Sequence, residues 1–476
     1  MNYLPTFGLE IHSQLATNTK IFCGCSTGFG SDPNSHSCPV CLGMPGVLPV
    51  LNRRAIELAV RVALLTGGDV QRRSYFARKN YFYPDLPKGY QISMYEFPLI
   101  KGGGIEVETE QNGRRFIHLN RIHLEEDAGK LIHADNRDAS YFDVNRCGVP
   151  LIEIVTEPDF ETLDEVAEFL DKLRDILVFS GASEGNMFRG NIRVDANISI
   201  RPEGQTELGT RTEIKNMNSF ANAITAIRLE ILRQTELVES GGAIIQQTLL
   251  FDADREALSP MRSKEEAHDY RYFPEPDLVP VVVNEEWVER IRAELPELRE
   301  QLMERFQSEC GLPEYDAGIL TSTPGMALYF EAVIRCGANP KKASNWIMGE
   351  VMRILNERQI EIAEFPVKAN DLAKLIAMID AGSISGSIAK TVFDEMTVHG
   401  GDPENIVAEK GLLQISDKGE LEAIVRRIVS AHPDEALKFR EGKKQLMGFF
   451  VGQIMRETKG KANPREVNEL LKDMLS

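Results

Sequence analysis

The sequence predicts an α+β protein in which an antiparallel sheet region is followed by an all-helical region. Up to about residue 215, apolar and polar residues alternate with a period of two, as at Leu9 and Ile11 and along 192–200. This pattern is typical of antiparallel strands with one buried face. From about residue 285, apolar residues recur every three or four positions between scattered prolines, which indicates helices. Because 476 residues exceed what one core usually supports, we expect more than one domain.

The expected elements follow in chain order. Helices should interrupt the sheet region at about 52–66, 162–180 and 219–237. Thr162 followed by Glu165 has the form of a capping box at the start of the second of these helices. A glycine-rich segment ending in Asp402 and Pro403 predicts a hinge. The predicted domains are 1–294 for the sheet, 295–405 for a helical domain and 406–476 for a helical tail.

Composition limits the function classes. The formal net charge is −18 and the pI is near 5.1, which argues against non-specific nucleic-acid binding as the main role, although it leaves room for a local basic patch. There is no run of 18 apolar residues, so we expect no membrane span. No signal peptide opens the sequence, so we expect a cytoplasmic protein with reduced thiols.

Four of the seven cysteines form two close pairs, Cys23 with Cys25 and Cys38 with Cys41. Two thiol pairs separated by a loop match the ligand pattern of a closed, structural Zn²⁺ site. The loop between them is rich in glycine, serine and proline, so a metal would supply the core that this stretch lacks. The alternative is four reduced thiols without a metal.

The polar faces of several predicted strands carry carboxylates and histidines. Glu10 and His12 share one face, His123 and Glu125 share another, and Glu153 projects from a third strand. A single acidic strand face is usually only solvated, but several in one sheet favour a hard divalent cation. Mg²⁺ prefers few protein ligands and lets substrate phosphates complete its shell.

The segment 72–90 combines cations with aromatic residues, among them Lys79, Tyr81 and Lys88. Such a segment could hold phosphates while its rings stack on a base. Alternatively, the rings are core residues and the cations extend to solvent. The sequence contains no P-loop and no dinucleotide fingerprint, so a nucleotide would have to be held by a metal and by strand side chains.

At this point the sequence resembles the GatB/GatE family, the B subunits of tRNA-dependent amidotransferases. The matching blocks are long and occur in family order, and the tail resembles the YqeY-like module of the family. The chain has no room for the extra domain of GatE-type members, so it is more similar to the GatB branch. These blocks are 8–12, 78–90, 123–130, 143–153, 213–220 and 270–278.

The resemblance implies a cradle domain similar to glutamine synthetase. It also implies ATP-dependent phosphorylation of the side-chain carboxylate of Glu-tRNA(Gln), Asp-tRNA(Asn) or both, followed by amidation. Ammonia would come from a partner amidase, the A subunit, in a heterotrimer that also contains the small C subunit; the chain itself has no recognisable amidase motif. The cofactors would be ATP, Mg²⁺ and structural Zn²⁺.

The expected site residues follow from these patterns. Glu10, His12 and Glu125 should hold Mg²⁺, with Glu153 as a further catalytic residue. Nucleotide and phosphate should contact Lys79, Tyr81, Lys88 and Arg211. In the tail, 437–465 carries eight cationic residues against two acidic ones, so it predicts tRNA binding through Lys443, Lys444, Lys459 and Lys461, unless these only solvate a helix face.

Two rival functions stay open at this stage. The first is a stand-alone ATP-dependent ligase of a small acid, which would turn over ATP with ammonia and without tRNA. The second is a non-catalytic tRNA-binding scaffold, in which the acidic strand faces would be solvated surface.

Overall fold

The structure is a computed structural model that describes residues 3–133, 139–187, 189–261, 270–413, 418–458 and 460–475. It comprises two compact units, Met1–Leu298 and Arg299–Ser476. The first combines a large sheet with helices and the second is helical in its described part, so the predicted mixture of both element types is confirmed. The division of the second unit at residue 405 stays a prediction.

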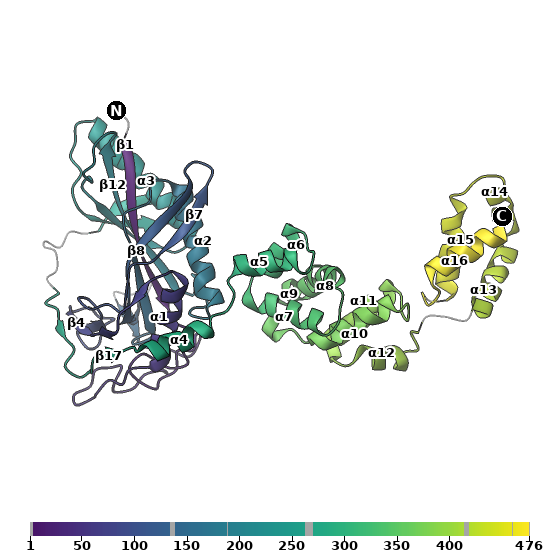
Figure 1. The fold of residues 1–476 in the computed structure, drawn as a ribbon, viewed down its shortest axis with the longest axis horizontal. Helices are drawn as coiled ribbons and strands as arrows, with labels where there is room; N and C mark the ends of the chain where they lie inside the picture. The colour runs from purple at the N-terminus through teal and green to yellow at the C-terminus, as the bar shows by residue number, and fades with distance from the viewer. Residues whose placement is uncertain are drawn as a thin grey trace. The chain divides into compact units, whose positions relative to one another are not determined.

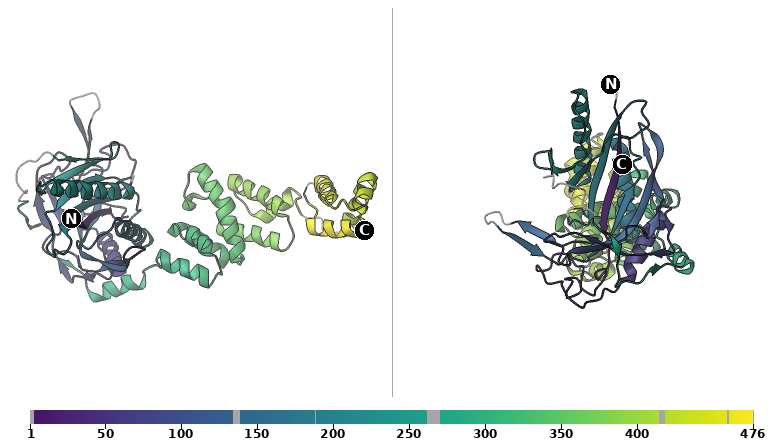
Figure 2. Two further views of the ribbon diagram at one scale, coloured as in Figure 1. Left: turned by 90° about the horizontal axis from the view of Figure 1, so that it is seen from above. Right: turned by 90° about the vertical axis from the view of Figure 1, so that its left-hand side faces the viewer.

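A large sheet organises the first unit, and its long strands β1, β8 and β12 run through the centre of the unit in Figure 1. The strand order is β15-β14-β13-β12-β1-β11-β8-β5-β4-β16, with β2, β6 and β7 joined near β8. The bounds are β1 Tyr3–Gln14, β2 Asp69–Val70, β4 Ala77–Asn80, β5 Tyr90–Ser93, β6 Ile100–Lys101, β7 Gly104–Thr109, β8 Gly113–Glu126, β11 Pro150–Thr156, β12 Ile192–Pro202, β13 Thr212–Met217, β14 Thr248–Asp252, β15 Ala257–Pro260 and β16 Phe273–Pro274. Two small sheets pair β9 (Lys130–His133) with β10 (Ser140–Asp143), a hairpin that projects in both views of Figure 2, and β3 (Arg73–Ser74) with β17 (Val281–Val282).

The two faces of the large sheet differ in polarity, as the period-two pattern predicts. Along β1, Leu9 and Ile11 are buried in the main core, whereas Glu10 and His12 on the other face are half-buried. The apolar face packs against α1, α2 and α3, because buried residues of these helices belong to the same core. The helices leave the opposite, polar face of the central strands open for side chains that carry chemistry.

The prediction of an antiparallel sheet is wrong for one strand pair. β13 and β14 run parallel, with Ile214 opposite Leu249. The chain leaves β13, crosses the apolar face through the long helix α3 and re-enters the sheet in β14. Such a crossover connection is what a parallel pair needs.

Side chains at their first turns fix the helices of this unit. Thr162 and Glu165 form the predicted capping box of α2 (Leu163–Phe179). Asn52 caps α1 (Arg53–Leu65) and Ser219 caps α3 (Phe220–Glu239) through their side-chain oxygens. The three expected helices are thereby confirmed, and α4 (Glu285–Ala293) packs on α1.

The second unit begins at Arg299. Its bounds are α5 Arg299–Ser308, α6 Glu314–Leu320, α7 Pro324–Arg335, α8 Pro340–Trp346, α9 Met352–Arg358, α10 Ala369–Asp380, α11 Gly386–His399, α12 Pro403–Glu409, α13 Lys418–Ala431, α14 Pro433–Arg440, α15 Leu446–Glu457 and α16 Pro464–Leu475, with a π-helical turn at Ile347–Val351 and a 3₁₀ turn at Ile362–Glu364. Helices α13 to α16 surround a small core of their own that includes Phe450 and Ile454. Among the described residues, no helix is both long and apolar enough to cross a bilayer.

Candidate functional site

Three polar side chains lie in one row across β1, β11 and β8. In the register of these strands, His12 is opposite Glu153, and Glu153 is opposite His123. The Nε2 atom of His12 is 3.4 Å from Glu153 Oε2, and the Nε2 atom of His123 is 3.3 Å from the same oxygen. The carboxylate of Glu153 therefore sits between two imidazoles.

Glu125 approaches this row from the next position of β8 on the same face. Its Oε1 atom is 3.6 Å from His12 Nε2, and its Oε2 atom accepts a hydrogen bond of 3.2 Å from the hydroxyl of Ser93 on β5. Ligand atoms of His12, Glu125 and Glu153 all lie within 4.8 Å of one another. The structure thus brings together three predicted site residues, together with His123.

The charges of these groups support one another. Burial lowers the pKa of His12, but the hydrogen bond to Glu153 and the charge of Glu125 outweigh this effect and raise it. Burial by itself would raise the pKa of Glu153, yet the charge of His123 and the hydrogen bond from His12 hold it well below its usual range. Glu153 is therefore ionised at neutral pH.

The donor set fits a divalent cation. Two carboxylates offer the oxygens that Mg²⁺ prefers, while the imidazoles also suit softer transition metals. In addition, the buried His123 Nδ1 has no hydrogen-bond partner among the described residues. A buried polar atom without a partner is what a missing ligand or ion leaves behind.

Glu10 lies on the same face but outside this cluster. Its Oε1 atom accepts a hydrogen bond of 3.0 Å from Asn197 on β12. Burial raises its pKa, and the charge of Glu153 raises it further. Glu10 and Asn197 line a cavity of about 630 Å³ together with the exposed Arg211, so two predicted residues border one space on the polar side of β1.

Arg193 is a neighbour of the cluster that the predicted set omits. It faces His12 across β1 and β12 and bonds Asp127 Oδ1 at 2.7 Å. Gln14 donates to the other oxygen of Asp127 at 2.7 Å. Arg193 therefore brings a positive charge to the side of His12 away from Glu153. The alternation within 192–200 could have identified it, because it places Arg193 on the polar face.

Lys79 and Tyr81 lie in an aromatic group near the carboxylates. The ammonium of Lys79 is 4.8 Å from the centre of the Tyr270 ring, and this ring contacts Tyr81 edge-on at 6.0 Å. Burial raises the pKa of Tyr81, and nearby carboxylates, among them Glu125, raise it further. The aromatic residues of this segment are thus half-buried contacts of its cations.

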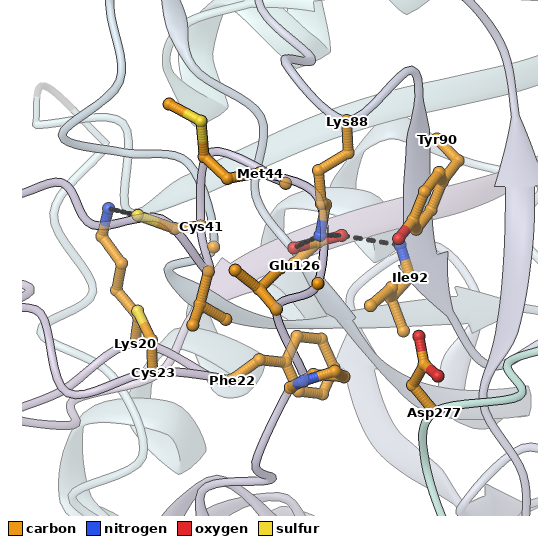
Figure 3. Close-up of a pocket in the computed structure, with 16 residues that line it drawn as sticks. Lys20, Phe22, Cys23, Cys41, Met44, Lys88, Tyr90, Ile92, Glu126 and Asp277 are labelled. Carbon is orange, nitrogen blue, oxygen red and sulfur yellow. Dashed lines mark hydrogen bonds and ion pairs between the residues drawn. The ribbon is translucent and has the colours of Figure 1, made fainter.

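Lys88 lies elsewhere. Its ammonium contacts both carboxylate oxygens of Glu126, which also accepts the Ile92 backbone N–H at 2.8 Å. Figure 3 shows this pair in a pocket that Cys41 and Lys20 also line. Because Glu126 follows Glu125 in β8, the two carboxylates point to opposite faces of the strand.

The cysteine cluster forms as predicted. The sulfurs of Cys23, Cys25, Cys38 and Cys41 all lie within 4.8 Å of one another, and those of Cys38 and Cys41 are 4.0 Å apart. A tetrahedral site with Zn–S bonds of about 2.3 Å separates its sulfurs by about 3.8 Å, so the four thiols fit Zn²⁺.

The cluster already favours thiolate character at one sulfur. A hydrogen bond from Cys23 lowers the pKa of Cys41 to about 4, and the charge of Lys20 contributes. Lys20 is fully buried, and its Nζ atom is 3.6 Å from Cys41 Sγ. Sequence reasoning missed this lysine because a single cation near a cysteine pair carries no spacing signal.

The predicted tRNA-binding lysines belong to the second unit. Lys443 and Lys444 are exposed just before α15, and Lys461 is half-buried beyond its end. Lys459 lies outside the described residues. The predicted role of these residues in tRNA binding is taken up below as part of the proposal.

Two family models match the chain. Residues 5–289 match the model described as the GatB/GatE catalytic domain, and residues 328–475 match the model described as the GatB domain. The first match contains every strand of the large sheet apart from the first residues of β1, together with both metal-type clusters.

Curated proteins are similar to the chain over its full length. Each of the following is named as the B subunit of an aspartyl/glutamyl-tRNA(Asn/Gln) amidotransferase. The identities are 53 % with the protein of Carboxydothermus hydrogenoformans (100 % of this chain and 99 % of the relative), 55 % with that of Geobacter sulfurreducens (99 % and 99 %) and 54 % with that of Desulfotalea psychrophila (100 % and 100 %).

Proposed function

The chain belongs to the GatB/GatE family, and from this premise we propose that it phosphorylates the side-chain carboxylate of Glu-tRNA(Gln) or Asp-tRNA(Asn) and then amidates it. It is the B-type subunit of a tRNA amidotransferase, a carbon–nitrogen ligase of translation. The relatives carry both substrates in their names, so both belong to the proposal.

The reaction needs two steps because a carboxylate is a poor electrophile. A carboxylate oxygen of the substrate first attacks the γ-phosphorus of ATP, which gives an acyl phosphate and ADP. Ammonia then attacks the acyl carbon, phosphate leaves, and the nitrogen loses a proton to give the amide. Both steps gain from fixed charges that face the developing negative oxygens.

One observation carries this proposal, namely the row of His12, Glu153 and His123 with Glu125 beside it. These residues would hold a divalent cation such as Mg²⁺, which supplies positive charge to phosphate oxygens when bound. Glu153 keeps the row in place as an ionised group between two imidazoles. Glu10, the fourth predicted catalytic residue, faces the adjoining cavity.

The same polar face offers a path for the nucleotide. Arg211 and Asn197 line the cavity beside Glu10 with groups that hydrogen-bond a phosphate or a ribose. Lys79 and Tyr81 border the carboxylates from β4 and the segment after it. Lys88 stays a predicted phosphate contact, although its ammonium is engaged by Glu126.

The wider assembly follows from the family. A sheet with one helical face and one carboxylate-bearing face supports a cradle of the glutamine-synthetase kind. The relatives are named as one subunit of a larger enzyme, which supports a complex with an amidase (the A subunit) and a small C subunit in a cytoplasmic setting. The four cysteines would hold structural Zn²⁺, and the lysines of 437–465 would contact the tRNA backbone.

Glu125→Gln tests the site. In the complex with its partner subunits, the variant should lose transfer of the γ-phosphate to aminoacyl-tRNA by about 100-fold or more, while tRNA affinity changes less than twofold. Glu106→Gln, an exposed carboxylate on β7, is the matched control and should be active. Wild-type turnover by Glu125→Gln would contradict the assignment.

The wild-type complex separates the rival functions in the same assay. ATP turnover that depends on aminoacyl-tRNA supports the proposal. Turnover with ammonia alone would favour a stand-alone ligase, and no turnover under any condition would favour a scaffold.

A further inference from the structure

An aromatic hollow lies between β4, β16 and the segment after β5. Two ring pairs border it: Tyr95 stacks on Tyr272 at 4.2 Å with an angle of 4°, and Tyr75 meets Phe97 edge-on at 5.3 Å. Its volume of about 340 Å³ is in the range of small-molecule sites. We name the lining residues the aromatic hollow: Tyr75, Phe76, Ala77, Tyr95, Glu96, Phe97, Tyr272, Phe273 and Pro274.

Its rings are unusually accessible for their size. Tyr95 is 50 % exposed, Phe97 51 % and Phe273 43 %. Rings that only fill a core would be buried, as Phe76 is at 3 %. The exposed rings therefore offer flat apolar faces to a ligand from solvent.

The hollow adjoins the reaction site. Ser93, whose hydroxyl bonds Glu125, precedes Tyr95 by two residues, a distance of about 7 Å along an extended chain. On the other side, Tyr272 contacts Tyr270 edge-on at 6.0 Å, and Lys79 lies over the Tyr270 ring. The charges of Glu125 and Glu153 add to the effect of burial in raising the pKa of Tyr272, which places this ring close to both carboxylates.

The chemistry of the hollow selects a stacking ligand. Glu96 is the one charged residue among those that line it, so it offers few groups for hydrogen-bond recognition. Cations stand at its margin, where the guanidinium of Arg73 lies 5.4 Å from the centre of the Tyr75 ring. Exposed rings with neighbouring cations are how proteins bind unpaired nucleotides, because each base stacks and each phosphate meets a positive charge.

We propose that the aromatic hollow stacks the unpaired 3′-terminal base of the aminoacyl-tRNA and so positions the esterified amino acid toward Glu125 and Glu153. This inference rests on the proposed function. The terminal base is joined to the reacting amino acid through one ribose, so it must bind within a nucleotide's length of the reaction site. The other candidate base, the adenine of ATP, has its own polar cavity beside Glu10, Asn197 and Arg211.

The test measures tRNA affinity in the complex with the partner subunits. Tyr95→Ala and Phe97→Ala should each weaken binding of uncharged tRNA about tenfold, because a base–aromatic stack contributes on the order of 1–3 kcal/mol. Tyr95→Phe keeps the ring and should bind like wild type. Phe116→Ala removes an equally exposed ring on β8 outside the hollow and should have no effect.

A second RNA shows which nucleotide the hollow contacts. tRNA that lacks only its 3′-terminal nucleotide should bind wild type and Tyr95→Ala equally, because the stacking partner is gone. The KM for ATP should change less than twofold in both alanine variants. Equal losses with the intact and the shortened tRNA would overturn the proposal, as would a raised KM for ATP with unchanged tRNA binding.

Loss of the assembled complex on size-exclusion chromatography, with unchanged tRNA affinity, would also overturn it and assign the hollow to a protein partner. Failure of the proposed function itself appears separately, as absence of phosphorylation by the wild-type complex, since the binding measurements need no turnover.

Discussion

Lys20 carries a buried positive charge whose worth depends on the state of the four cysteines. Its side chain is fully buried, and its Nζ atom donates to the carbonyl oxygens of His36 at 2.7 Å and Val144 at 3.2 Å besides contacting Cys41. Burying an ammonium costs several kcal/mol unless an anion compensates it. Four thiolates on Zn²⁺ carry two net negative charges, so a zinc-bound cluster supplies that anion.

Lys20→Met keeps the length of the side chain and removes the charge. With an anionic cluster, the variant loses two hydrogen bonds from a charged donor and leaves the sulfurs uncompensated. Hydrogen bonds to charged groups contribute about 1.5–3 kcal/mol each, with incomplete additivity, so we expect a loss of about 2–4 kcal/mol. With four neutral thiols, the relief of burying an ammonium would make the same variant neutral or more stable.

Thermal unfolding of the purified full-length chain, with its zinc content measured in parallel, checks this sign. One kcal/mol shifts the midpoint by about 2–4 °C for a domain of this order of size, so the zinc-loaded variant should unfold roughly 4–12 °C lower. Lys101→Met, which removes an exposed charge from the same unit, should shift the midpoint by less than about 2 °C. An unchanged or higher midpoint for Lys20→Met with zinc bound would refute the reasoning.

Further outcomes follow from other contacts. Cys38→Ser should release Zn²⁺ and loosen the loop, and elemental analysis of freshly purified wild type without zinc would contradict the site. Burial opposes ionisation of Glu165, but hydrogen bonds from Asn112 and from backbone amides hold its pKa below the usual value, so its contribution is present above pH 4.5 and is lost as the pH falls through the folded pKa. Glu165→Gln should therefore cost about 1–3 kcal/mol in urea unfolding at pH 7 and much less at pH 3; an equal cost at both would contradict this. Removal of 406–476 should raise the KM for tRNA and flatten its salt dependence without affecting ATP binding, and an unaltered salt slope would exclude the tail as a tRNA contact. Lys88→Met should lower kcat at constant KM for ATP if Lys88 acts through its neighbour on β8, whereas a raised KM for ATP would support direct phosphate binding.

The alternation within each strand predicted which residues share a face, but it could not predict the register between strands. Glu10 and His12 are equivalent in the sequence pattern, yet only His12 stands opposite Glu153. A shift of pairing along the strand would have exchanged their roles, because side chains on one face recur every second residue. For the same reason, His123 enters the row through a pairing that no single strand encodes.

Local chemistry was easier to predict than long-range placement. The cysteine cluster forms because its ligands are close in sequence, and the helix caps depend on residues within one turn. Lys79 and Lys88 come from one basic segment, yet they lie in different surroundings because the intervening turn carries the chain from β4 to β5. Their separation depends on Glu126, which belongs to another strand.

Strand β8 gives the cysteine loop a physical connection to the reaction site. Glu125 faces the histidines, and Glu126, its immediate neighbour, faces the pocket beside Cys41 and accepts the ammonium of Lys88. Glu126 also accepts the Ile92 N–H, which fixes the end of β8 against the strand that carries the hydroxyl partner of Glu125. A metal that orders the loop therefore also orders the backbone from which Glu125 projects. Because a hydrogen-bonded strand moves as a unit, a structural zinc site can affect catalysis without touching the substrate.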